Sequence, residues 1–186
     1  MNENSWTKSI CDILNFQKLG NNIYADVLKK LPYATDIISL TDDWKIKDKN
    51  NKSFETDLIV YEKIKGKIIP RVVIESKIES VSTHDAITYS QKAFDHKYII
   101  PYLRYGIMLG KRGNYPLPGR LFRHGAYFDF YFSFVGYKPT KNEINDFVDM
   151  IKREIKYSKQ LEEILINNRK KDRKRYYMLQ KKFYLK

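Results

Sequence analysis

The sequence predicts an α/β protein in which helices flank a mixed central sheet and a long helix lies near the C-terminus. Three runs, 57–64, 71–78 and 105–109, are predicted to be strands; 71–78 is rich in β-branched residues, and 105–109 has the length of a short buried strand. Two segments with apolar residues at helical spacing, 83–97 and 140–155, each have a hydroxyl side chain placed to cap the helix N-terminus. Strands and helices that alternate along one chain are typical of an α/β domain.

The N-terminal third combines helical and extended segments. Residues Trp6–Leu31 are expected to be mainly helical, with a break at Gly20 and a stop at Pro32. Ala34–Leu40 is expected to be a strand, which the polar residues 42–53 connect to the next strand. The core candidates of this part are Leu14, Ile23, Val27, Leu28 and Leu31.

The middle of the chain contributes a helix, a loop and an aromatic strand. The helix begins at Ser82 or Thr83 and ends near Lys97. The Gly/Pro/basic segment Gly110–Gly125 is expected to be a loop, which fits either a DNA-groove contact or a solvated connection. Tyr127–Val135 is expected to be a strand whose alternating phenylalanines face the core.

A capping box at Thr140–Glu143 opens the long C-terminal helix. We expect a single domain over 1–166 and a basic tail over 167–186, in which nine basic residues accompany one acid. The whole chain carries a net charge of +13, so an anionic partner is expected, nucleic acid first and a membrane surface second. The apolar face of the helix consists of Ile144, Phe147, Val148, Ile151 and Ile155.

Several classes of protein are excluded. The single cysteine, Cys11, rules out a disulfide scaffold within one chain and a cysteine-rich zinc site. The first residues lack the basic and apolar regions of a secretory signal, and the longest apolar runs are far too short to cross a membrane. We therefore expect a soluble cytoplasmic protein with no membrane partner.

The chemistry is concentrated in a predicted hairpin of the strands 57–64 and 71–78. If the hairpin is symmetric about Gly66, Asp57 lies directly opposite Glu75, and their Cβ atoms are about 5 Å apart, close enough for the two carboxylates to share one divalent cation. Strand alternation places Lys77 on the same face. Two carboxylates can hold Mg²⁺, which lowers the pKa of a bound water, while an ammonium stabilises the negative charge that develops during phosphodiester hydrolysis.

This pattern resembles the PD-(D/E)XK nuclease signature, with Asp57 on one strand and Glu75-Ser76-Lys77 closing the next. The resemblance covers roughly residues 34–110 and implies a restriction-endonuclease-like fold. It also implies that Asp57, Glu75 and the Ser76 carbonyl bind the metal and that Lys77 is the catalytic lysine. Many members carry an acid on the preceding helix, and Asp26 is the nearest candidate here, although the usual residue is Glu. The sequence departs from the signature in having Thr56 in place of proline.

The resemblance implies a Mg²⁺-dependent DNA endonuclease, a small sequence-specific restriction enzyme, and double-stranded DNA as the partner. Cutting both strands needs two active sites, so a homodimer is expected. On the helix that follows the lysine, Gln91 and Lys92 are candidates to orient water or contact phosphate, and an ordinary helix surface is an equal interpretation. The alternatives are a structure-specific resolvase or repair nuclease, and a non-catalytic nucleic-acid-binding protein in which the charged residues form a cross-strand salt-bridge cluster.

Overall fold

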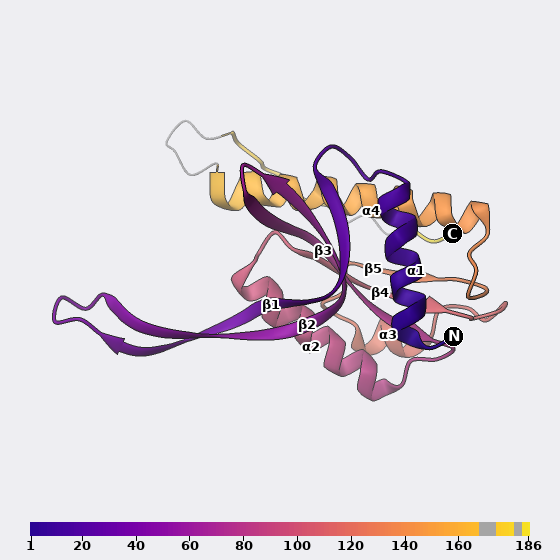
Figure 1. Cartoon of the computed structure of the whole chain (residues 1–186), viewed down its shortest axis with the longest axis horizontal. Helices are drawn as coiled ribbons and strands as arrows, with labels where there is room; N and C mark the ends of the chain where they lie inside the picture. The colour runs from indigo at the N-terminus through magenta and orange to yellow at the C-terminus, as the bar shows by residue number, and fades with distance from the viewer. Residues whose placement is uncertain (168–173, 181–183) are drawn as a thin grey trace.

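The structure is a computed structural model, and it describes residues 1–167, 174–180 and 184–186. Its centre is a five-stranded sheet in the order β1-β2-β3-β4-β5, in which β1, β2 and β3 are antiparallel neighbours and β3, β4 and β5 run parallel (Figure 1). This is the α/β class predicted, with helices on both faces. The strands are β1 (Ile23–Leu40), β2 (Ile46–Ile64), β3 (Lys67–Ile78), β4 (Arg104–Gly110) and β5 (Phe130–Ser133).

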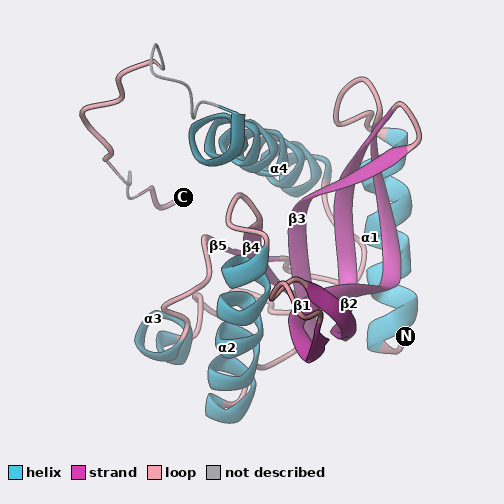
Figure 2. Ribbon diagram, turned by 90° about the vertical axis from the view of Figure 1, so that its left-hand side faces the viewer, coloured by secondary structure: helices cyan, strands magenta, loops and turns pink. Residues whose placement is uncertain are grey.

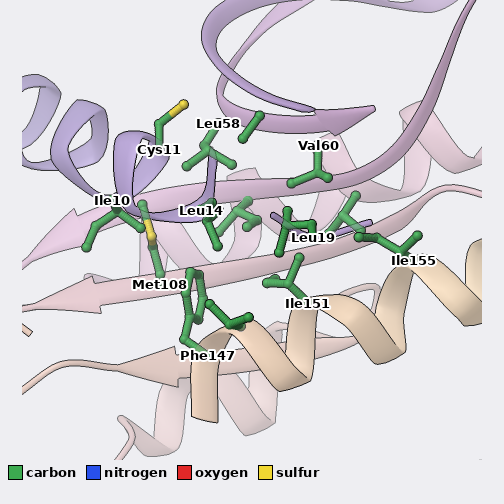
Figure 3. Close-up of a cluster of buried hydrophobic side chains, with 14 of the residues drawn as sticks. Ile10, Cys11, Leu14, Leu19, Leu58, Val60, Met108, Phe147, Ile151 and Ile155 are labelled. Atoms are coloured by element: carbon green, nitrogen blue, oxygen red, sulfur yellow. The ribbon is translucent and has the colours of Figure 1, made fainter. Parts of the chain in front are cut away.

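Helices cover the two faces of the sheet unequally (Figure 2). One face packs against α1 (Glu3–Phe16) and α4 (Lys141–Glu162), and these elements share the largest hydrophobic cluster (Figure 3). The other face packs against α2 (Thr83–Ile99) and α3 (Gly119–His124) through two smaller clusters. A short π-helical turn, Glu163–Asn167, follows α4. Among the described residues, no helix is long and apolar enough to cross a membrane.

The expected second helix is wrong, because the chain is extended from Ile23 onward. At the start of β1 alternate residues face the core, as Ile23 and Ala25 are buried, and the strand pairs with β2 from Ile23 to Leu40. Pro32 lies within β1 instead of ending a helix, and an edge strand tolerates it because one row of backbone amides has no strand partner there. Leu28 is 45% exposed and is not a core residue.

The polar stretch after β1 is not a connection but the end of a long two-stranded arm (Figure 1). We call residues Thr35–Ser53 the arm. Pairing continues to Leu40 opposite Ile46, and a tight turn closes the tip. The arm is anchored at its base by Leu31, which is buried, and by Phe54, whose ring stacks on Tyr33 at 3.7 Å and meets His96 edge-on.

The hairpin between β2 and β3 carries one extra residue. Its turn is Lys65-Gly66, both at positive φ, and it pairs Ile64 with Lys67. A β-bulge at Arg71 then shifts the register, so that Leu58 lies opposite Ile74, as predicted. The predicted register next to the site is therefore confirmed, although it arises from a two-residue turn plus a bulge and not from a turn centred on Gly66.

Other expected elements agree with the structure or differ only in detail. Ser82 caps α2 in a capping box with Asp85, and Thr140 does the same for α4 with Glu143. The expected loop Gly110–Gly125 contains the short helix α3. The aromatic strand is shorter than expected, but its phenylalanines do pack into the hydrophobic clusters. The expected basic tail, 167–186, lies partly outside the described residues.

Candidate active site

The predicted residues Asp57, Glu75 and Lys77 lie near the end of β3, close to the start of α1 and to the middle of α2. Asp57 accepts hydrogen bonds at Oδ2 from the Ser76 amide at 2.8 Å and from the Ser76 hydroxyl at 3.2 Å. Both bonds use one oxygen, so Oδ1 of the same carboxylate is not engaged by Ser76. The Asp57 side chain is thus fixed against the backbone of the residue that follows Glu75.

Glu75 is fully buried and is held through one oxygen. Its Oε1 accepts a 2.5 Å hydrogen bond from the Tyr105 hydroxyl and lies 2.9 Å from the Lys92 ammonium. Its Oε2 has no hydrogen-bond partner among the residues that the structure describes. Burial raises the pKa of Glu75 to about 7; the Lys92 charge opposes this shift, while the Asp57 carboxylate adds to it. A buried carboxylate oxygen without a partner is costly, so this site has an unmet demand for a cation or a proton.

Lys77 bridges the two helices at this edge. Its ammonium lies 3.3 Å from Glu3 Oε1 on α1 and 5.4 Å from the centre of the Tyr89 ring on α2. Burial alone would lower the pKa of Lys77, but the Tyr89 hydroxyl and the Glu3 carboxylate outweigh it, so the pKa is raised above its usual value. Lys77 is therefore a cation at neutral pH.

The helix α2 contributes Lys92 to the site, while Gln91 stays outside. Lys92 contacts the carbonyl oxygen of Glu55 at 2.5 Å in addition to Glu75, and its side chain is only 14% exposed. Gln91 instead donates to Asp95 on the helix surface. Of the two candidates on this helix, Lys92 is the one that contacts a predicted metal ligand.

Asp26 lies on β1 and not on a helix. Its carboxylate accepts a hydrogen bond from the Val27 amide and pairs with Lys29 at 3.0 Å, so these contacts stay within its own strand. The helix that precedes the hairpin is α1, and its first residue, Glu3, contacts Lys77. The prediction for Asp26 depends on a helix that extends to Leu31, and that helix is absent because the chain is extended from Ile23 onward. Glu3 is the acid that the structure brings to the lysine.

The Ser76 side chain ties the site to α1. Its hydroxyl is buried and lies 2.7 Å from the Thr7 hydroxyl, one helical turn after Glu3. The amide and the hydroxyl of Ser76 are thus both engaged, and the role of its carbonyl as a metal ligand stays a prediction. This link fixes the spacing between α1 and the end of β3, and with it the contact between Glu3 and Lys77.

The chemistry of these side chains fits Mg²⁺. Within the part of the chain that the structure describes, no group of three or more His, Cys, Asp or Glu side chains is arranged as a metal site. Mg²⁺ does not need such a cage, since it is commonly held by one or two carboxylates and keeps waters and substrate phosphates as its other ligands. Asp57 and Glu75 are the residues that would hold it, and the Oε2 atom of Glu75 is the strongest indication.

The basic loop after β4 lies at the same edge of the sheet. Lys111 pairs with Glu79, just beyond the end of β3, and Arg112 donates to the Glu79 and Pro116 carbonyls. Arg120 and Arg123 follow on the exposed side of α3. The start of this basic loop therefore lies beside the end of β3, the strand that carries Glu75 and Lys77.

Comparison with known proteins gives no independent assignment. No protein-family model matches the chain, and no curated protein matches it.

Proposed function

We propose that the protein is a Mg²⁺-dependent endonuclease that hydrolyses phosphodiester bonds in double-stranded DNA. The observation that carries the proposal is the Glu75 carboxylate, buried on a β-strand beside Asp57 with one oxygen unpartnered, two residues before the cationic Lys77. Strongly perturbed ionisable groups of this kind cluster at functional sites, and a bound Mg²⁺ would satisfy the Glu75 oxygen that has no partner among the described residues.

Each side chain has a distinct role in this proposal. Asp57 and Glu75 would hold Mg²⁺, which would supply a water of lowered pKa and charge stabilisation at the phosphate. Tyr105 and Lys92 fix Oε1 of Glu75, which orients Oε2. Hydrogen bonds and ion pairs to a metal ligand hold its side chain in place and affect the affinity for the metal.

Lys77 acts as a fixed positive charge. Because its pKa is raised, it stays protonated at neutral pH and donates hydrogen bonds, instead of accepting a proton as a general base. Its ammonium stabilises the negative charge that develops on the phosphate and holds the attacking water by donation. Glu3 positions the ammonium from α1.

The test is cleavage of supercoiled plasmid and linear DNA with Mg²⁺ or with EDTA, beside the variants Lys77→Met and Lys63→Met. Lys63 lies at the far end of the same hairpin, over the rings of Tyr24 and Tyr61, so it is the matched control. Cleavage that needs Mg²⁺, falls by at least about 10³-fold with Lys77→Met and persists with Lys63→Met is expected. DNA retardation on a gel should survive in the Lys77→Met protein.

The cleavage products distinguish a restriction enzyme from a resolvase or repair nuclease. Discrete bands from linear DNA indicate a sequence-specific restriction enzyme, while cutting confined to branched or damaged DNA indicates a resolvase or repair nuclease. Retardation of DNA by the intact protein with no cleavage under any metal condition would contradict the proposal and leave a binding protein.

A further inference from the structure

The arm, Thr35–Ser53, exposes an unusual amount of apolar surface for a segment of its length. Every residue in it is exposed except Ser39, which is half-buried. Trp44 at the tip is 83% exposed, whereas the other tryptophan, Trp6, is fully buried. A two-stranded ribbon without a third strand or a covering helix is only marginally stable in water, so a partner surface would stabilise it. The large exposed apolar side chains are Ile37, Ile38, Leu40, Trp44 and Ile46.

The charge of the arm differs from that of the rest of the molecule. Its four lysines are balanced by four aspartates, so the net charge of +13 lies wholly outside the arm. Some of the opposite charges already pair within the arm, as Lys52 with Asp36 and Lys45 with Asp43. A surface with no net charge does not match the phosphate backbone of a nucleic acid, which binds positively charged surfaces. An apolar and charge-balanced surface matches protein.

We infer that the arm is the surface through which two copies of this chain associate, arm against arm. Two strongly basic copies can meet at the arm without charge repulsion, because the arm projects from the body and is itself neutral (Figure 1). A surface that carries both signs of charge and apolar side chains in one short segment can complement itself, as a twofold contact requires.

Side chains, and not backbone pairing, make this contact. The arm strands have register shifts between Ile37 and Ser39 and between Ser39 and Leu40, next to the apolar tip. Such irregularities interrupt the row of backbone donors and acceptors that another strand would need. The apolar side chains at the tip are then the groups that pack across the twofold axis.

The contact would also set the distance between two active sites, and this part rests on the proposed function. The base of the arm adjoins the site, because the Glu55 carbonyl accepts from Lys92 and Asp57 follows two residues later. The strand from Ile46 to Glu55 is about 30 Å long at the usual rise per residue. Two arms that meet near their tips hold the two sites apart and leave room for a duplex between the basic bodies.

The test is sedimentation velocity of the wild type and of a triple arm variant, Ile38→Ser, Trp44→Ser and Ile46→Ser. The matched control is Phe16→Ser with Tyr98→Ser, since these residues are 83% and 79% exposed but lie on α1 and α2. We expect a dimer for the wild type and the control at micromolar concentration and a monomer for the arm variant. Thermal unfolding confirms that each variant is folded.

Trp44 provides a second measurement that does not depend on mass. In the monomer, acrylamide should quench about half of the tryptophan fluorescence, because one of the two tryptophans is exposed. As the wild type is concentrated, the quenchable fraction should fall. A wild type that stays monomeric, an arm variant that stays dimeric, or a quenchable fraction that changes only when DNA is added would each overturn the inference, the last in favour of a DNA contact.

Failure of this inference is distinguishable from failure of the proposed function. A dimer that is lost in the arm variant supports the inference even if no cleavage is found. Cleavage by a wild type that sediments as a monomer overturns the inference and leaves the nuclease proposal standing. If both hold, the arm variant should nick plasmid DNA under conditions in which the wild type linearises it.

Discussion

The two halves of β2 have the same secondary structure but opposite surroundings. From Leu58 to Val60 the strand is buried between helices on both faces of the sheet, and next to it the charged site is held by contacts from α1, α2 and β4. From Ile46 to Ser53 the strand is exposed, and in the described part of the chain it pairs with β1 alone. The comparison shows that the central packing fixes the site and leaves the arm free to present side chains outward.

The largest expected difference between the two halves is in stability, and one strand offers a matched pair of isoleucines. Ile59→Ala, in the buried half, should lower the free energy of unfolding by about 2–4 kcal/mol, because it leaves a cavity between helix and sheet. Ile46→Ala, in the arm, should change it by less than about 0.5 kcal/mol. Urea unfolding of dilute protein measures both. Equal costs would show that the arm is packed against something in the monomer.

The packing at the base of the arm should make the stability of the protein fall in acid. His96 is buried against Phe54, and its Nε2 lies 3.1 Å from the Leu31 carbonyl. Burial lowers the pKa of His96 to about 4, so the fold favours the neutral ring. This preference contributes fully to the free energy of unfolding above pH 6.5, which is about the pKa of histidine in the unfolded chain. The contribution, up to about 3 kcal/mol, is lost as the pH falls toward 4.

The measurement for His96 is the free energy of unfolding at pH 7 and at pH 4.5, for the wild type and for His96→Gln. The variant should be less stable at pH 7 but should lose less on acidification. His84→Gln, on the exposed surface of α2, should follow the wild type at both pH values. A His96→Gln protein with the same pH dependence as the wild type would show that this ring does not titrate with folding.

The smallest effect is expected at Glu3, which tests the half of the comparison that concerns the active site. Glu3→Gln removes a charge from beside Lys77 and should lower kcat of DNA cleavage about tenfold with little change in KM. Glu79→Gln, which removes the partner of Lys111 instead, is the control and should leave kcat within about twofold. An unchanged kcat for Glu3→Gln would mean that Lys77 is positioned without α1.

Local patterns in the sequence predicted the α/β class, the hairpin register beside Asp57 and the two capped helices, because each depends on residues close together along the chain. The helix predicted over Ile23–Leu31 is wrong, because the apolar spacing of these residues fits a helix as well as a strand, and only pairing with distant β2 decides between them. The partners Glu3, Lys92 and Tyr105 come from three other elements, and tertiary packing alone brings them to Glu75 and Lys77.

The bulge at Arg71 makes the length of the hairpin as important as its composition. With an unbroken ladder from Ile64 opposite Lys67, Asp57 would face Ile74 and the carboxylate of Glu75 would lie on the other side of the sheet. Related chains should therefore tolerate exchanges of residue type around this position more readily than the gain or loss of one residue. In an alignment, the count of residues between the turn and Glu75 would be a better marker of a retained site than any single side chain in between.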